Sequence, residues 1–220
     1  NEIAQLYSAF AHRQANPLPP LPVQYADFAV WQRSTLGSIG IQQQLEFWRN
    51  TLAGHENLGF PGDFARPAIA DNHGASIKFM LGHDTTAALH GLAKQHNTTL
   101  FVVLLSLFGS LLYRYSRQPQ FCIGTPVAGR SHSQCETLAG CFLNLLALPT
   151  TYSSSTSFAG LLEQNRRMTM AAFANQDVPF EEVVRATVTT RNLSATPLFQ
   201  VLFSLQNTPY LGGIEYRTHI

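Results

Sequence analysis

The sequence predicts an α/β fold of the α+β type, with two layers in which helices pack on a mixed sheet. Three observations lead to this prediction. Several segments place apolar residues at the three- and four-residue spacing of a helix with one buried face. Shorter segments alternate apolar and polar residues, as half-buried strands do. The order after residue 75 is mostly strand, helix, helix, strand, strand, helix, strand, which suits a mixed sheet covered by helices.

The first part of the chain is expected to be helical, with one extended interruption. The predicted helices span residues 1–11, 25–36 and 41–52. Four apolar residues share one face of the first helix: Ile3, Leu6, Tyr7 and Phe10. The segment 16–22 (NPLPPLP) is predicted to be an extended strap, because proline lacks the amide donor and clashes with the preceding helical turn. Residues 61–74 contain two prolines and two glycines and are predicted to be a linker.

The rest of the chain alternates strands and helices. The predicted strands span residues 76–81, 121–125, 142–148, 198–206 and 214–220. The predicted helices span residues 85–96, 98–115, 157–174 and 179–186, and a polar loop covers 129–137. Helix N-caps are expected from Asp84, from Thr98 or Thr99, and from Ser157, whose side-chain oxygens can accept amide protons. Pro179 suits the first turn of the last helix.

The composition excludes several classes of protein. Hydrophobic residues make up 45% of the chain and charged residues 12%, with a net charge of +1, so nucleic acid and an acidic membrane surface are not expected partners. The longest apolar run, Leu100–Leu112, is shorter than the ~20 residues of a membrane span and is predicted to be a buried core helix. The three cysteines cannot all pair, and free thiols in apolar surroundings favour a reducing, cytoplasmic location.

No self-contained catalytic motif is present. The sequence lacks GxSxG, a P-loop, HExxH and CxxC, and its eight histidines are scattered without a metal-ligand spacing, so no metal site is expected. From the residues alone, the prediction ends at an α/β domain of unknown function.

Four segments, however, resemble signature sequences of one family. They are Tyr25–Trp31 (YADFAVW), beside YxD(F/Y)AVW; Ala139–Leu145 (AGCFLNL), beside (I/V)GxFVNT; Asn175–Glu181 (NQDVPFE), beside (H/N)QDxPFE; and Arg191–Leu198 (RNLSATPL), beside RDxSRxPL. Two further segments with family character are Gly124–Arg130 and Leu198–Asn207. Because all six occur in the family's order, the sequence resembles the condensation domain of nonribosomal peptide synthetases. It departs from the signatures at Leu145, usually threonine, and Asn192, usually aspartate.

The resemblance implies a chloramphenicol acetyltransferase-like fold, with two lobes facing each other across a tunnel. Residues 1–60 then correspond to the end of the N-terminal lobe, 61–74 to the inter-lobe linker, and 75–220 to an incomplete C-terminal lobe. The family's HHxxxDG motif, which supplies the catalytic histidine, is not in this sequence, so no catalytic residue is assigned and this piece alone is expected to be inactive.

The resemblance also implies a reaction: amide bond formation between an acyl or peptidyl thioester on one carrier protein and an aminoacyl thioester on another. The implied partners are the upstream and downstream carrier proteins and a neighbouring adenylation domain. No cofactor is bound directly, because the phosphopantetheine arms belong to the carriers. Two rival functions stay open on the same fold: an epimerization domain, and a non-catalytic module that only docks carriers.

Candidate site residues follow from the matched motifs. Substrate-tunnel candidates are Asn144, Gln176 and Asp177, although Asn144 equally fits a structural hydrogen bond and Asp177 a helix cap. Structural motif residues are Tyr25, Asp27, Trp31, Arg130, Pro179, Phe180 and Arg191.

Among these motif residues, Trp31 is expected to be a core anchor together with Phe28, and Asp27 is expected to tie a helix end. Arg130 is either the partner of the aspartate in HHxxxDG or a solvated loop arginine.

Overall fold

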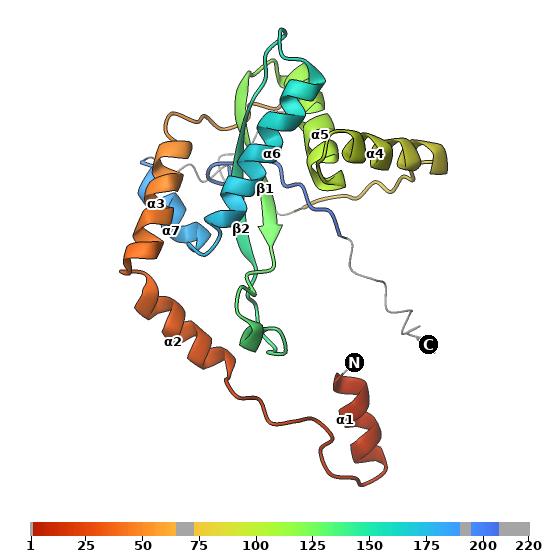
Figure 1. Cartoon of the computed structure of the whole chain (residues 1–220), viewed down its shortest axis with the longest axis vertical. Helices are drawn as coiled ribbons and strands as arrows, with labels where there is room; N and C mark the ends of the chain where they lie inside the picture. The colour runs from red at the N-terminus through yellow and green to blue at the C-terminus, as the bar shows by residue number, and fades with distance from the viewer. Residues whose placement is uncertain (1, 65–72, 190–194, 207–220) are drawn as a thin grey trace.

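A computed structural model of the chain describes residues 2–64, 73–189 and 195–206 (Figure 1). The helices are α1 (Glu2–Ala11), α2 (Tyr25–Thr35), α3 (Ile39–Thr51), α4 (His83–Gln95), α5 (Leu100–Ser116), α6 (Phe158–Ala174) and α7 (Phe180–Thr187). The strands are β1 (Gln120–Val127) and β2 (Asn144–Thr151), and a short 3-10 turn spans Ser133–Cys135. All seven predicted helices are present, with ends within two residues of the prediction.

The sheet of the described residues is small, and a single parallel bridge lies beside it. β1 and β2 are antiparallel, in a register that runs from Gln120 opposite Thr151 to Val127 opposite Asn144. On the other side of β1, the Gly124 amide donates to Val201 O (2.9 Å) and the Phe203 amide donates to Gly124 O (2.8 Å), a parallel bridge. The described residues thus contain one antiparallel strand pair and one parallel bridge, and 198–206, predicted to be a strand, forms only that bridge.

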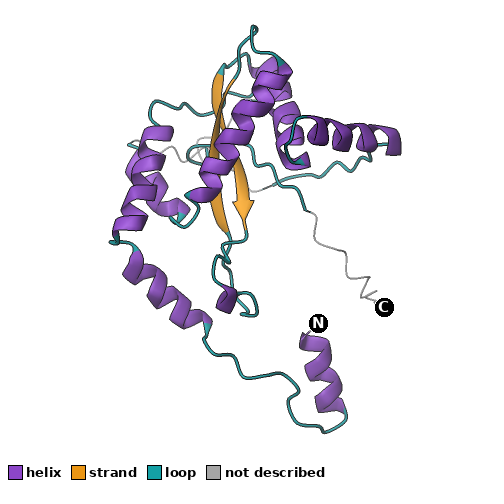
Figure 2. Ribbon diagram, viewed as in Figure 1, coloured by secondary structure: helices purple, strands orange, loops and turns teal. Residues whose placement is uncertain are grey.

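Helices surround this strand pair (Figure 2). α6 and α7 pack on β2, α5 packs on α6, α4 packs on α5, and α3 packs on α7. The main hydrophobic core joins Phe121 and Ile123 of β1, Leu146 of β2 and Trp48 of α3, all of them fully buried. α3, which the sequence places at the end of the N-terminal lobe, thus shares one core with β1 and β2; the division into lobes remains a prediction.

The helix caps show how local the sequence signals are. Thr99 Oγ1 accepts from the Val102 amide (3.3 Å) and Ser157 Oγ accepts from the Gly160 amide (3.1 Å), which confirms both as N-caps. The Asp84 cap is wrong: α4 follows Gly82, so Asp84 lies inside the first turn. There its carboxylate can still interact favourably with the positive end of the helix dipole.

Two apolar faces that the sequence pattern predicts to be buried are exposed in the structure. Residues 76–81 form no strand, and Ile77 (90% exposed), Phe79 (80%) and Met80 (94%) face solvent. The alternating pattern describes a strand with one buried face, but within the described residues no second strand pairs with it. The apolar face of α1 is likewise exposed, and α1 lies away from the sheet beyond an extended segment (Figure 1). The predicted strand 214–220 lies outside the described residues.

α5 is a core helix, as the sequence predicts: Val102, Val103, Leu105 and Leu112 are buried. No single helix in the described ranges is long and apolar enough to cross a membrane. α4 and α5 together would be long and apolar enough for a membrane span, but they are bent by 107° at their junction. Of the cysteines, Cys122 and Cys135 are buried, whereas Cys141 is exposed.

Candidate functional site

Three of the four signature segments meet at one hollow of about 280 Å³. The first contributes Tyr25 and Phe28 from α2, the second contributes the run 141–145, and the third contributes Pro179 and Phe180 at the start of α7. These segments are far apart in sequence, so the fold brings the motif residues together. Arg191, the motif residue of the fourth signature segment, lies outside the described residues.

The first signature segment docks onto the second through Tyr25. Its hydroxyl donates to Cys141 O at 2.8 Å, and its ring lies edge-on to Phe142 with centroids 5.1 Å apart. The close approach requires Gly140, because a Cβ there would lie 2.9 Å or closer to three atoms of the Tyr25 ring. Tyr25 is thus seated on a glycine of the second motif.

Two other residues of the first segment have different environments. Asp27 Oδ2 accepts from the Gln24 amide at 2.8 Å, so it ties the start of α2 as expected. Trp31 is 43% exposed and packs edge-on against His132, 4.7 Å between ring centroids. The expectation that Trp31 is a core anchor is wrong, because α2 lies at the edge of the molecule and buries none of its residues.

Asn144 is the best-connected polar side chain of the hollow. Its Nδ2 donates to Gln176 O and Val178 O, both at 2.8 Å, and its Oδ1 accepts from the amides of Phe180 (3.0 Å) and Leu145 (2.9 Å). An amide side chain offers two protons and two lone pairs, and all are used here. The Phe180 bond also satisfies an amide in the first turn of α7, where Pro179 provides no side-chain cap.

The segment 175–179, called the α6–α7 loop below, is also held from α3. Gln44 Nε2 donates to Asp177 Oδ2 and the Asp177 amide donates to Gln44 Oε1, both at 3.1 Å. Trp48 Nε1 donates to Asn175 O at 2.8 Å. Asp177 therefore pairs with α3 and does not cap α7. Sequence reasoning missed Gln44 and Trp48, since a glutamine and a tryptophan on an amphipathic helix carry no motif.

Arg130 turns back onto its own loop. Its guanidinium donates to Cys135 O and lies 4.3 Å from the centroid of the Phe142 ring. It is half-buried, and these contacts tie the segment after β1 to the second signature segment. Pairing with the aspartate of an HHxxxDG motif stays a prediction.

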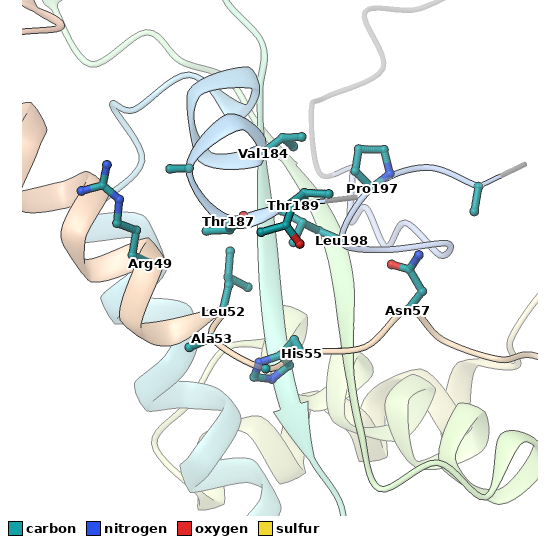
Figure 3. Close-up of a pocket in the computed structure, with 14 residues that line it drawn as sticks. Arg49, Leu52, Ala53, His55, Asn57, Val184, Thr187, Thr189, Pro197 and Leu198 are labelled. Carbon is teal, nitrogen blue, oxygen red and sulfur yellow. The ribbon is translucent and has the colours of Figure 1, made fainter. Parts of the chain in front are cut away.

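A second, larger cavity of about 800 Å³ lies at the end of α3 (Figure 3). Its labelled lining residues include Arg49, His55, Asn57, Thr189 and Leu198. Both ring nitrogens of His55 are buried, and burial lowers the His55 pKa, an effect that the neighbouring Ala53 backbone partly opposes. No cluster of three or more His, Cys, Asp or Glu side chains suited to a metal ion occurs in the described ranges.

Comparison with known proteins matches nearly the whole chain, including the signature segments, to one protein family. A family model described as "Condensation domain" matches residues 1–219. A linear gramicidin synthase protein from Brevibacillus parabrevis is 44% identical over 209 residues, which is 94% of this chain and 4% of that protein. The chain thus spans a small part of the curated relatives it matches.

Solved structures agree with the sequence relatives. The X-domain from teicoplanin biosynthesis superposes with a TM-score of 0.85 at 26% identity, over 91% of this chain and 46% of that one. The four-domain nonribosomal peptide synthetase AB3403, bound to AMP and glycine, gives a TM-score of 0.76 at 28% identity, over 81% of this chain and 14% of that one.

Proposed function

The chain belongs to the condensation domain family, and from that premise we propose that its parent protein joins two carrier-bound substrates by an amide bond. The fold is the chloramphenicol acetyltransferase-like fold expected from the sequence. The observation that carries the proposal is the convergence of three signature segments on the hollow around Asn144. The first two of these segments are more than 100 residues apart, so the fold and not local structure brings them to the same hollow.

The reaction needs no external reductant or oxidant. The amine of the aminoacyl thioester attacks the carbonyl carbon of the acyl or peptidyl thioester, and a C–N bond forms. The C–S bond breaks, and the sulfur leaves on the donor carrier's phosphopantetheine arm with the proton lost by the amine. Holding both thioesters in line can supply much of the rate, because it replaces an encounter in solution with an oriented reaction.

The residues of this chain would line the substrate tunnel and would not transfer protons. Gln176 and Asp177 stand on the α6–α7 loop, whose Pro179 lines the hollow, but neither of the two lines it. The Gln176 side chain donates to Phe173 O at the end of α6 (2.9 Å), and Asp177 is exposed. Both stay tunnel candidates in this proposal. The proton-handling histidine belongs to the HHxxxDG motif, which this sequence lacks, so the 220-residue chain by itself should form no amide.

The remaining parts of the proposal concern partners. The carriers upstream and downstream bring the phosphopantetheine arms, so the domain binds no cofactor of its own. The proposal places the parent domain in a multidomain synthetase with carrier and adenylation domains, and it is supported by the likeness to AB3403, a four-domain nonribosomal peptide synthetase. A neighbouring adenylation domain and a cytoplasmic location complete the proposal.

The proposal is tested with the intact domain and two separately loaded carriers. The expected product is an elongated thioester on the downstream carrier, seen by its intact mass. The 220-residue chain alone and a sample without enzyme should both leave the carriers unchanged. An inverted α-carbon without elongation would indicate an epimerization domain. Carrier binding without either product would indicate a docking module.

A further inference from the structure

The α6–α7 loop is held on one side by β2. Asn144 donates to two of its carbonyls, Gln176 O and Val178 O, and accepts from the Phe180 amide that follows it. Because the Leu145 amide occupies the remaining lone pair, no hydrogen-bonding position of the Asn144 amide is open to a substrate.

The same loop is held on its other side by α3. Trp48, 1% exposed, donates to Asn175 O, and Gln44 makes a reciprocal pair with Asp177. The Trp48 side chain is enclosed in the main core and cannot reach a ligand. The Asp177 carboxylate, by contrast, belongs to an exposed residue on the held loop.

We propose that Asn144, Gln44 and Trp48 form a two-sided clamp of positioning residues for the α6–α7 loop. They act through the loop, which presents Gln176 and Asp177 to the thioester substrates, and they do not contact substrate themselves. The role rests on the proposed condensation reaction. The proposal gives a positioning role to Gln44 and Trp48 of α3, which lie outside every signature segment. It gives Asn144, in the second signature segment, an indirect role in place of substrate contact.

The first test compares a partly buried asparagine, Asn144, with a buried one, Asn165, in the intact domain. Asn144→Asp removes the donor to both loop carbonyls and sets an oxygen against them. We expect kcat/KM per folded molecule to fall by about tenfold or more, since one hydrogen bond is worth up to about a factor of ten. Asn165→Asp is the matched control. Asn165 is 3% exposed and bonds to Ser106 and Thr150, away from the loop.

Asn165→Asp should lower the melting temperature but leave kcat/KM per folded molecule unchanged. If both variants lose the same fraction of kcat/KM, or if Asn144→Asp loses none, the positioning role is overturned.

The second test uses the solvent-facing pair, where folding is not at risk. Gln44→Glu removes the donor to Asp177 and brings two carboxylates together, so kcat/KM should fall about fivefold. In an Asp177→Asn background the asparagine supplies the missing donor, and the same Gln44→Glu change should cost less than about twofold. Equal losses in both backgrounds would contradict the clamp.

Hydrogen exchange separates this inference from the proposed reaction. Gln44→Ala removes the acceptor of the Asp177 amide, which should exchange about tenfold faster, while the Phe180 amide, bonded to Asn144, keeps its rate. Unchanged exchange at Asp177 would refute the α3 side of the clamp. If exchange responds but the wild-type domain forms no amide, the condensation reaction is refuted, and with it the clamp's role in that reaction.

Discussion

Replacing Gly124 by alanine probes the packing that joins residues 198–206 to β1. A Cβ at Gly124 would lie no farther than 2.6 Å from three atoms of the Phe199 ring. Phe199 is 4% exposed and lies near Phe180, 5.4 Å between ring centroids, so its ring cannot swing into solvent. The backbone of Gly124 also carries both hydrogen bonds of the parallel bridge.

The expected cost follows from two opposing terms. Overpacking a filled core costs about 1–3 kcal/mol. Alanine is favoured over glycine within a strand by about 0.5–1 kcal/mol, which offsets part of that cost. Gly124→Ala should therefore lower the free energy of unfolding of the intact domain by up to about 2.5 kcal/mol, measured by urea denaturation.

A matched control is available in α4. A Cβ at Gly91 meets nothing within 4 Å, so Gly91→Ala should be neutral or stabilising by up to about 1 kcal/mol. In a Phe199→Leu background, with its smaller side chain, the cost of Gly124→Ala should shrink. A Gly124→Ala variant as stable as Gly91→Ala would refute the packing argument.

Three other predictions address single side chains. His55→Gln should flatten the pH dependence of stability: because burial lowers the folded pKa below the ordinary 6.5, stability is full above that value and declines as pH falls below it. An equal change in the urea midpoint between about pH 7.5 and about pH 5.5 in the wild type and the variant would contradict this. A thiol reagent should modify exposed Cys141 before Cys122, whose pKa burial raises to about 12; equal rates in the folded domain would show otherwise. Arg130→Ala should lower the melting temperature, by loss of about 1–3 kcal/mol from the carbonyl bond and the Phe142 ring contact, with partial rescue by Arg130→Lys; an unchanged melting temperature would return Arg130 to a solvated loop position.

Local chemistry made the helices predictable from sequence. Thr99 and Ser157 cap helices through amides three residues away, so the signal and its partner lie in the same short segment. The amide at Asn144, within an apolar strand, correctly indicated that a polar partner was needed. That partner is the α6–α7 loop, more than 30 residues away, and nothing in the strand's pattern identifies it.

Long-range partners explain what the sequence could not provide. Segment 76–81 has the alternation of a strand, but a strand also needs a neighbour, and alternation does not name one. Leu198 has a positive φ of 69°, unfavourable for a bulky residue, so the first residue of the strand expected over 198–206 is not extended. The Gln44–Asp177 contact spans 133 positions along the chain. Only the folded structure brings these residues together.

The central claim, that this chain is part of an amide-forming site, is tested most directly by single-turnover transfer between loaded carriers in the intact domain. The elongated thioester should accumulate on the downstream carrier, as a direct mass increase, well above uncatalysed aminolysis in the same mixture. A correctly folded domain that binds both carriers yet transfers no faster than that background would contradict the claim.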